Sequence, residues 1–227
     1  MSQSEQKPIE TEVPYTAPYY SSLLVGLIHK LNNVATVLTG NAGLLLMGEK
    51  LPSDVRDSLE QMTQAIEQLS QTLNEASIAG KGSKVNLDTV DLAALISAME
   101  SPIEIELVQP EKKRLNVKSD PDKLRAILHE LCKNAVSAGA TKVTCKLEPA
   151  AAGNYLIRFR DNGSGIKKEI MTRIFDPFFT SRSYPAAFGL GLFRAAGELS
   201  RIGGSISVGS DGKSFTEVRI LLPGAIG

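Results

Sequence analysis

The stretch Asp161-Asn162-Gly163-Ser164-Gly165-Ile166 follows a run, Tyr155 to Arg160, in which apolar and polar residues alternate. Such alternation predicts a half-buried β-strand, so this glycine-containing stretch begins where a strand ends. Glycines at 163 and 165 let the backbone pass close to a planar ligand, and a buried Asp161 can accept a hydrogen bond from an exocyclic amine. An ordinary Asn-Gly turn is the alternative, which this stretch alone leaves open.

The rest of residues 84–227 mixes strand and helix patterns on both sides of this stretch. Asp120-Pro121-Asp122 is a helix-capping sequence, and Gly203-Gly204 closes a later helix. The predicted strands are 103–108, 115–118, 141–147, 155–160, 205–208 and 215–222, and the predicted helices are 90–99, about 121–138 and 190–202. This order predicts an α+β fold, in which helices cover one face of a mixed sheet.

The predicted helix after Asp120 contains the sequence His129-Glu130-Leu131-Cys132-Lys133-Asn134-Ala135. Glu130 and Asn134 are four residues apart, so a carboxylate and a carboxamide share one face of this helix. Two oxygen ligands placed in this way suit Mg²⁺, which completes its octahedron with phosphates and water. Because such pairs are also common on solvated faces, this segment needs support from others.

Two further segments have unusual composition. Residues 174–182, Ile-Phe-Asp-Pro-Phe-Phe-Thr-Ser-Arg, place aromatic side chains in a loop-like stretch, and we expect an exposed lid or docking patch. Phe188-Gly189-Leu190-Gly191-Leu192 lies at the start of a predicted helix. Free N–H groups and the helix dipole favour an anion there, and glycine permits close approach of a phosphate.

The first 80 residues have the periodicity of long helices. We predict a first helix from about Tyr19 or Ser21 to Met47 and a second from Ser53 to about Gly80. Their apolar residues recur at steps of three and four, as in the seam of a helical bundle. The seam residues are Leu24, Leu27, Leu31, Val34, Leu38 and Leu45 in the first helix, and Leu59, Met62, Ile66, Leu69, Leu73 and Ala76 in the second.

One of the two histidines of the chain, His29, lies in the first of these helices. If Leu24 and Leu31 take the a positions of a heptad, His29 is at f and Asn33 at the following c. Both side chains then point into solvent on one face, one turn apart. An exposed imidazole beside a carboxamide is a candidate chemical site, although a surface histidine without a role gives the same pattern.

A hairpin of two such helices cannot bury both seams by itself. Pairing with a second copy would form an antiparallel four-helix bundle, so we expect a homodimer. The alternative is a hairpin that folds back on its own C-terminal domain.

Composition excludes several classes of protein. The 227 residues carry 25 Lys and Arg against 25 Asp and Glu, which gives no bulk support for a nucleic acid or membrane-surface partner. The first 80 residues carry 4 basic and 9 acidic residues and the remainder 21 and 16, so a basic module follows an acidic one. Only two widely spaced cysteines are present, which indicates neither a disulfide framework nor a zinc site.

Together, these segments resemble the histidine kinase family, within the ATPase superfamily shared with gyrase and MutL. The resemblance covers residues 19 to 224. Residues 130–135 resemble the N box, 161–165 the first glycine box, 175–179 the F box, 189–192 the second glycine box, and the stretch around His29 the H box of the dimerisation and phosphotransfer hairpin.

The resemblance implies a role for each matching residue. Asn134 and Glu130 would bind Mg²⁺, Asp161 would receive the adenine amine of ATP, and Lys133 would reach the phosphates. The glycines would shape the pocket and a lid between residues 162 and 188. The implied ATP-binding residues are Glu130, Lys133, Asn134, Asp161, Gly163, Gly165, Gly189, Leu190, Gly191 and Leu192.

The resemblance also implies a reaction at His29. Its imidazole would take the γ-phosphoryl group of ATP and pass it to an aspartate in the receiver domain of a response regulator. Such transfer depends mainly on positioning and charge neutralisation. Asn33, four residues after the histidine, occupies the position that orients water for dephosphorylation of the regulator in the family.

Two positions depart from the family pattern. The family usually has an acidic residue directly after the histidine, which can take up the imidazole proton, but this chain has Lys30. A cation cannot accept that proton. The second glycine box also lacks its leading glycine, with Ala186-Ala187-Phe188 in that region. The autokinase activity therefore stays open at this point.

Three functions are compatible with these observations. The first is a histidine kinase that phosphorylates His29. The second is a response-regulator phosphatase that uses Asn33 and has little autokinase activity. The third is a phosphotransfer or scaffold dimer with a weakly active nucleotide domain.

We predict three parts of the chain: a flexible leader at 1–18, a dimerisation and histidine-phosphotransfer hairpin at 19–82, and a catalytic ATP-binding domain, an α/β sandwich, at 83–227. No signal peptide or membrane-spanning run of 18 to 20 apolar residues is visible, so we expect a cytoplasmic protein without membrane insertion. A separate sensor or input protein would then supply the signal.

Overall fold

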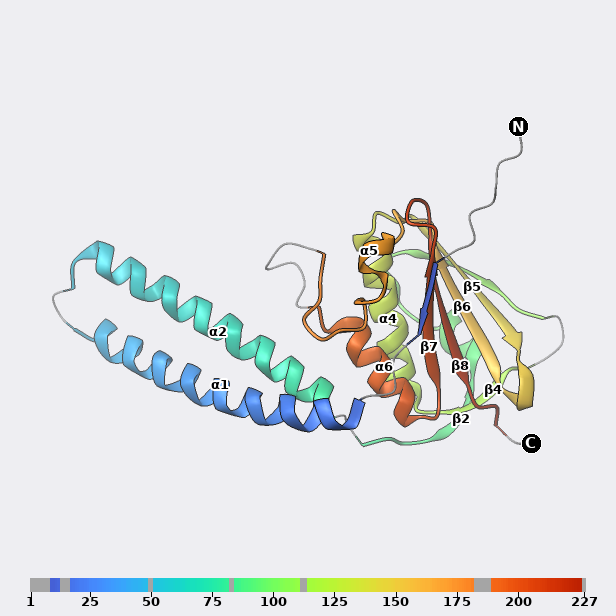
Figure 1. Cartoon of the computed structure of the whole chain (residues 1–227), viewed down its shortest axis with the longest axis horizontal. Helices are drawn as coiled ribbons and strands as arrows, with labels where there is room; N and C mark the ends of the chain where they lie inside the picture. The colour runs from blue at the N-terminus through green and yellow to red at the C-terminus, as the bar shows by residue number, and fades with distance from the viewer. Residues whose placement is uncertain are drawn as a thin grey trace. The chain divides into compact units, whose positions relative to one another are not determined.

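The computed structural model describes residues 9–12, 17–48, 51–81, 84–110, 114–181 and 189–225. The chain divides into two compact units (Figure 1). One unit is Thr16–Ser83, and the other combines Met1–Tyr15 with Lys84–Gly227. Each is described by itself below.

The first unit consists of two long helices, α1 (Ala17–Leu46) and α2 (Ser53–Lys81), which pack against each other. The buried side chains of each helix recur every seven residues, which keeps one stripe facing the neighbouring helix. Two of the three on α1 are alanines, and their small size suits close contact. The buried residues are Ile28, Ala35 and Ala42 on α1 and Leu59, Ile66 and Leu73 on α2.

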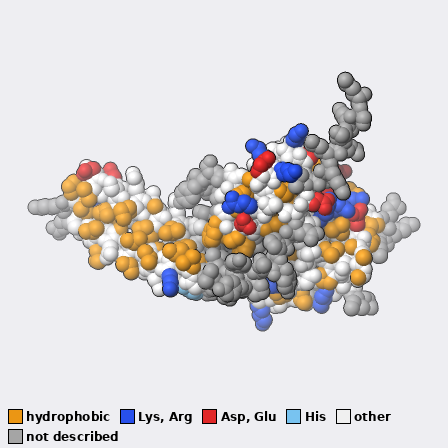
Figure 2. Space-filling model, in the orientation of Figure 1, with side chains coloured by type: hydrophobic (Ala, Val, Ile, Leu, Met, Phe, Trp, Pro, Cys, Tyr) orange, Lys and Arg blue, Asp and Glu red, His pale blue; other side chains and the backbone are white. Residues whose placement is uncertain are grey.

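The seam predicted for α1 is not its contact with α2. Leu27, Leu31, Val34, Leu38 and Leu45 are 40–57% exposed, while the positions directly after Leu27, Val34 and Asn41 are buried. Met62 and Leu69 of α2 are also about half exposed. Figure 2 shows the resulting apolar side chains gathered on the surface of this unit. The helices therefore carry a wide apolar face, of which their mutual contact covers only one edge.

The second unit is built on a six-stranded mixed sheet in the order β1-β7-β8-β6-β5-β3. Only β3 and β5 pair in parallel. A second, two-stranded sheet is formed by β2 and β4, which pair antiparallel. The strands are β1 (Ile9–Glu12), β2 (Asp88–Asp91), β3 (Glu104–Val108), β4 (Asn116–Ser119), β5 (Lys142–Pro149), β6 (Tyr155–Asp161), β7 (Ser205–Ser210) and β8 (Thr216–Leu222). The helices are α3 (Leu92–Ser97), α4 (Pro121–Ser137), the 3₁₀ turn Ala151–Gly153, α5 (Lys168–Met171) and α6 (Gly191–Arg201).

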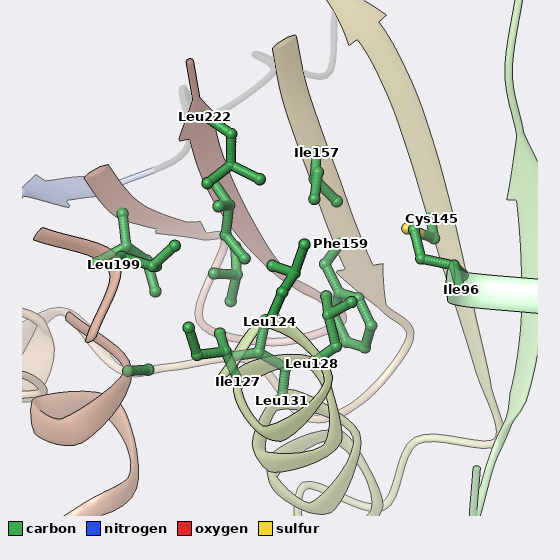
Figure 3. Packing of buried hydrophobic residues seen from close by; sticks show 14 of the residues in the cluster. Ile96, Leu124, Ile127, Leu128, Leu131, Cys145, Ile157, Phe159, Leu199 and Leu222 are labelled. Carbon is green, nitrogen blue, oxygen red and sulfur yellow. The ribbon is translucent and has the colours of Figure 1, made fainter. Parts of the chain in front are cut away.

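The core lies between this sheet and helices α4 and α6, as the α+β prediction requires. Alternate residues of β5, β6 and β8 are buried, whereas their neighbours are more exposed. In Figure 3, Leu124, Ile127, Leu128 and Leu131 of α4 lie among the core side chains of the sheet. Lys123 Nζ and Glu198 Oε2, 2.6 Å apart and nearly buried, join α4 to α6.

The N-terminus of α4 is fixed by Asp120, as its capping sequence predicts. Asp120 Oδ1 accepts hydrogen bonds from Asp122 N at 3.1 Å and Lys123 N at 3.2 Å, and Oδ2 accepts one from Asn86 N at 2.8 Å. Burial alone would raise the pKa of this carboxyl group, but the backbone hydrogen bonds outweigh it and the pKa is lowered. The helix that carries Glu130 and Asn134 therefore begins at a defined residue.

The prediction of a flexible leader over residues 1–18 is wrong for residues 9–12. These residues form β1, which pairs antiparallel with β7, and α1 begins at Ala17. The composition of residues 1–18 did not indicate this strand, since its prolines and polar residues are typical of disordered segments. An unpaired edge of β7 offers free N–H and C=O groups that a short alternating sequence can satisfy. Residues 1–8 and 13–16 lie outside the described residues.

One predicted helix is also shorter than expected. The range 90–99 includes the end of β2 and then α3, because Asp91 caps the helix. Its Oδ1 accepts from Ala93 N at 3.0 Å and Ala94 N at 3.2 Å. Among the described residues, none of the helices is long and apolar enough to cross a bilayer.

Candidate functional site

The aspartate predicted to receive an amine lies at the end of β6. Asp161 is 7% exposed, and its Oδ1 accepts from Gly163 N at 2.8 Å and Thr216 N at 3.3 Å. Among the described residues, Oδ2 accepts no hydrogen bond. Burial raises the pKa of Asp161, although these two hydrogen bonds and Arg160 oppose the rise. A buried carboxylate with one oxygen available suits an N–H donor on a ligand.

The loop after Asp161 is held against the end of α4 and the start of β5. Ser164 N donates to Ala138 O at 3.0 Å, and a Cβ on Gly163 would lie 2.9 Å from both Ala138 Cβ and Asp161 Oδ1. Asn162 Oδ1 accepts from the N–H groups of Thr141 and Lys142. The stretch leads to α5 rather than directly into a paired strand.

The sequence analysis missed Ser210, which fixes the second half of this loop. Ser210 is fully buried at the end of β7, and its Oγ accepts from Ile166 N at 2.8 Å and Gly212 N at 3.1 Å. The same hydroxyl donates to Phe215 O at 2.6 Å. A Cβ on Gly165, whose φ is +69°, would lie 2.8 Å from Ser210 Oγ. A polar residue that interrupts the apolar face of a strand at the turn is the signal that could have identified it.

Glu130 and Asn134 share one face of α4, as predicted, and both are partly buried. The structure adds a partner that the sequence did not reveal, because Arg194 Nη2 lies 3.4 Å from Glu130 Oε2. Lys133 is exposed. Within the described ranges no three His, Cys, Asp or Glu side chains gather as a metal site would require. A cation held by Glu130 and Asn134 would therefore need further ligands from a bound molecule or water.

The two glycines of 189–191 bring three segments together. Gly191, the first residue of α6, lies so close to Glu130 that a Cβ would overlap its carboxylate. Gly189, with a φ of +67°, lies against the backbone of Phe178 and Phe179. Leu190, buried, and the half-buried Leu192 flank Gly191. The predicted glycine box thus contacts both the segment of Glu130 and the aromatic segment.

The expectation of an exposed aromatic cluster is only partly right. Phe175 is 8% exposed and belongs, with Ile174 and Met171, to the hydrophobic core. Phe178 is 43% exposed and has a φ of +65°. The Arg173 guanidinium lies 4.5 Å above the ring of Phe179. Residues 182–188, which include the Ala186-Ala187-Phe188 departure, lie outside the described residues.

The start of α6 has the features of an anion site. Leu190 is the N-cap and makes no side-chain capping bond, and the first helical hydrogen bond runs from Arg194 N to Leu190 O at 2.9 Å. The N–H groups of Gly191, Leu192 and Phe193 therefore have no acceptor within the helix. These N–H groups and the positive end of the dipole favour a phosphate beside Glu130.

His29 and Asn33 lie in the helical unit. Both are exposed on α1, one turn apart, and Lys30 beside them is exposed as well. Their exposure agrees with the prediction that both face solvent, although the buried stripe of α1 falls on Ile28, Ala35 and Ala42 rather than on the predicted seam.

Comparison with protein families identifies the class of the second unit. Residues 119–226 match the family described as "Histidine kinase-, DNA gyrase B-, and HSP90-like ATPase". This part of the chain is a histidine kinase-type ATPase domain.

The most similar curated proteins include sensor kinases. Sporulation kinase D of Bacillus subtilis (strain 168) is 28% identical over 215 residues, which are 89% of this chain and 41% of that protein. The C4-dicarboxylate transport sensor protein DctB of Pseudomonas aeruginosa is 24% identical over 91% of this chain and 36% of its own length. The chain spans less than half the length of these relatives.

Solved structures share the fold. The crystal structure of full-length ShkA in complex with AMPPNP matches with a TM-score of 0.61 at 23% identity, over 91% of this chain and 46% of that one. The histidine kinase AdeS of Acinetobacter baumannii matches with a TM-score of 0.53 at 20% identity, over 86% and 97% of the two chains.

We predict that Gly189→Ala destabilises the chain and that Gly197→Ala does not. The left-handed backbone of Gly189 costs an alanine about 1–2 kcal/mol, and its Cβ would also overlap the backbone of Phe178 and Phe179. Gly197 lies inside α6 with open space around it, so alanine there should gain up to about 1 kcal/mol. Urea unfolding of both variants measures the difference, and equal stabilities would contradict the close contact at Gly189.

We predict that Asp161→Asn is at least as stable as the wild type at pH 7. The asparagine oxygen can still accept from Gly163 N and Thr216 N. Because the folded pKa of Asp161 is raised, the stability linked to this group is present below its unfolded pKa and is lost as pH rises through the folded pKa. The advantage of the variant should therefore shrink as the pH falls to about 4.

Thermal unfolding from pH 4 to pH 7 tests this prediction, with Asp57→Asn, an exposed site on α2, as the control. A variant that is less stable than the wild type at pH 7 would contradict it.

Proposed function

We propose that the chain is a two-component histidine kinase that binds ATP with Mg²⁺, phosphorylates itself on His29 and passes the phosphoryl group to an aspartate of a response regulator. The observation that carries this proposal is the buried carboxylate of Asp161, with Oδ2 available, in the same unit as the uncapped start of α6. The Asp161 carboxylate suits a base with an exocyclic amine, and the start of α6 suits phosphates.

The nucleotide would be held mainly by backbone and by few side chains. Asp161 Oδ2 would accept the adenine amine, and the absence of a Cβ at Gly163 and Gly165 would let the loop approach the ring. The first N–H groups of α6, from Gly191 onward, would bind phosphate oxygens. Lys133, exposed on α4, is long enough and suitably charged to add a contact to the phosphates.

The donor set on α4 fits Mg²⁺. Glu130 and Asn134 supply one carboxylate and one carboxamide, and the phosphates with water would complete the octahedron. When bound, the ion would neutralise charge on the phosphates during transfer. Arg194 bears on this role, because its Nη2 lies 3.4 Å from Glu130 Oε2. Glu130 would have to share or leave that pair when it binds the metal.

At the other end of the reaction, a ring nitrogen of His29 would attack the γ-phosphorus. A P–N bond forms, the bond from phosphorus to the bridging oxygen breaks, and ADP leaves with that electron pair. The proton on the imidazole must pass to an acceptor. Lys30 cannot serve as one, so water or a group outside this turn of α1 takes that role.

The helical unit would form the dimer. Its apolar face retains five predicted seam residues of α1 at 40–57% exposure, and two of α2 beside them. A second copy of the same face would cover these side chains in an antiparallel four-helix bundle. His29 and Asn33 would remain outside the seam, where a receiver domain could reach them.

A second function has support from one observation. Lys30 replaces the acidic residue expected next to His29, while Asn33 stays exposed one turn away. A carboxamide can orient a water molecule without any change in charge. The chain would then act chiefly as a response-regulator phosphatase, with nucleotide as an effector.

Phosphorylation with labelled ATP and Mg²⁺ separates these functions. The kinase proposal predicts an acid-labile label that is absent from His29→Ala and present in Asn33→Ala. The variant Lys30→Glu should label at least tenfold faster if the lost proton acceptor limits the rate, since general-base assistance contributes about 10²–10⁴-fold.

An unlabelled wild type that binds ATP in calorimetry would contradict the kinase proposal. Dephosphorylation of a receiver domain that is lost in Asn33→Ala would then support the phosphatase. Absence of ATP binding would contradict both the kinase and the nucleotide-dependent phosphatase, and would favour the phosphotransfer or scaffold dimer.

We also predict that the paired change Leu31→Asp with Leu38→Asp disrupts the dimer. Burial of a leucine contributes about 1.5–3 kcal/mol, and twofold symmetry doubles the number of affected sites. The dimer should therefore dissociate at least a thousandfold more readily. Sedimentation over a range of concentrations measures this, with Thr36→Asp, an exposed polar site on α1, as the control. An unchanged dimer would contradict the bundle.

A further inference from the structure

Strand β1 occupies the outer edge of the ATPase sheet, although it precedes the helical unit in sequence. Its four residues pair with β7, from Ile9 opposite Ser210 to Glu12 opposite Ser207. Glu10 Oε1 lies 2.7 Å from Arg219 Nη1 on β8, two strands away from β1 in the sheet. β1 also contacts α5, the helix that follows the glycine loop. The strand thus touches β7, β8 and the segment after Asp161.

The register of β1 places it against the residue that fixes the nucleotide loop. Ile9 is opposite Ser210, whose Oγ binds Ile166 N, Gly212 N and Phe215 O. Directly after that turn, Thr216 N donates to Asp161 Oδ1. The edge strand, the end of β7, the glycine loop and the buried carboxylate therefore form one contiguous set of contacts.

Strand β1 is attached at the edge of the sheet by four paired residues, its contact with α5 and an ion pair at the surface. Ordering a short strand costs backbone entropy, and an ion pair at the surface offsets little of that cost. Glu10 is more than half exposed in its pair with Arg219. Arg219 Nε also lies 2.6 Å from Glu217 Oε1, so the cation keeps an acidic partner if β1 leaves.

We propose that the edge of β7 is a strand-docking surface, that residues 9–12 of this chain are its occupant, and that occupancy sets the nucleotide affinity of the ATPase unit. A docked β1 holds the end of β7, so that Ser210 keeps residues 165–166 in the conformation that approaches the base. Release of β1 loosens that end and lowers the population of the binding-competent loop. This proposal rests on the proposed ATP site.

The docking of β1 on β7 also affects how the helical unit is connected to the ATPase unit along the chain. Only residues 13–16 separate β1 from α1, and only residues 82–87 separate α2 from β2. With β1 docked, the helical unit is an insertion whose two ends are both attached to the ATPase unit. With β1 released, one attachment remains. A partner that binds the N-terminal segment would therefore act on both units through a single strand.

Full-length variants at Thr11 test the proposal. Thr11→Pro removes a backbone N–H and opposes strand pairing, whereas Thr11→Val keeps the strand and serves as the control. Glu10→Ala, a milder change, should give an intermediate effect. We expect faster amide exchange at residues 163–166 in nucleotide-free Thr11→Pro, and about tenfold weaker AMPPNP binding if the competent loop falls to a tenth of its population.

A peptide of residues 5–16 provides a rescue. Added to Thr11→Pro, it should slow exchange at 163–166 and restore AMPPNP affinity, which a variant that had merely misfolded could not do. If Thr11→Pro and Thr11→Val exchange and bind alike, the proposal is overturned while the ATP site stands. If amide exchange at 163–166 rises in Thr11→Pro but neither Thr11→Pro nor Thr11→Val binds AMPPNP, the proposed function is contradicted. The proposed effect of β1 on nucleotide affinity is then overturned as well, whereas its effect on the loop stands.

Discussion

The burial of one carboxylate at the end of β6 is the interaction on which the site depends. Asp161 Oδ1 ties the glycine loop at Gly163 to the start of β8 at Thr216. The charge is disfavoured there, as its raised pKa indicates, because burial outweighs the hydrogen bonds that stabilise it. The proposed recognition of an amine by this carboxylate would therefore come at a cost in stability.

Around this carboxylate, glycines allow the backbone to come unusually close to its neighbours. Gly163 lies against Ala138, Gly189 against the backbone of Phe178 and Phe179, and Gly191 against Glu130. In each case a Cβ would overlap its neighbour. These contacts bring the ends of β6, α4 and α6 together, which leaves the first N–H groups of α6 beside the carboxylate of Glu130. A surface built in this way is suited to a ligand with a flat base and a chain of phosphates.

In the helical unit, most of the large apolar side chains lie outside the contact between α1 and α2. Its internal contact uses one narrow stripe with alanines at 35 and 42, and its larger leucines stay about half exposed. An apolar face of this extent on a pair of helices is typical of an interface with another molecule. The candidate phosphoacceptor His29 lies off that face, so the proposed phosphotransfer and the proposed association would use separate surfaces of the same helix.

Sequence alone determined the α+β class, the two helices and the places of Asp161, Gly189 and Gly191 at the ends of their elements, because periodicity, capping and glycine placement are local properties. It also placed Glu130 and Asn134 on one face of a helix, since four residues are about one turn. Only the tertiary structure decided what those residues meet. Arg194 pairs with Glu130 across two helices, Ser210 holds a loop that is 44 residues earlier, and residues 9–12 join a strand almost 200 residues later. Such contacts depend on which elements become neighbours when the core closes, and no local pattern encodes that choice.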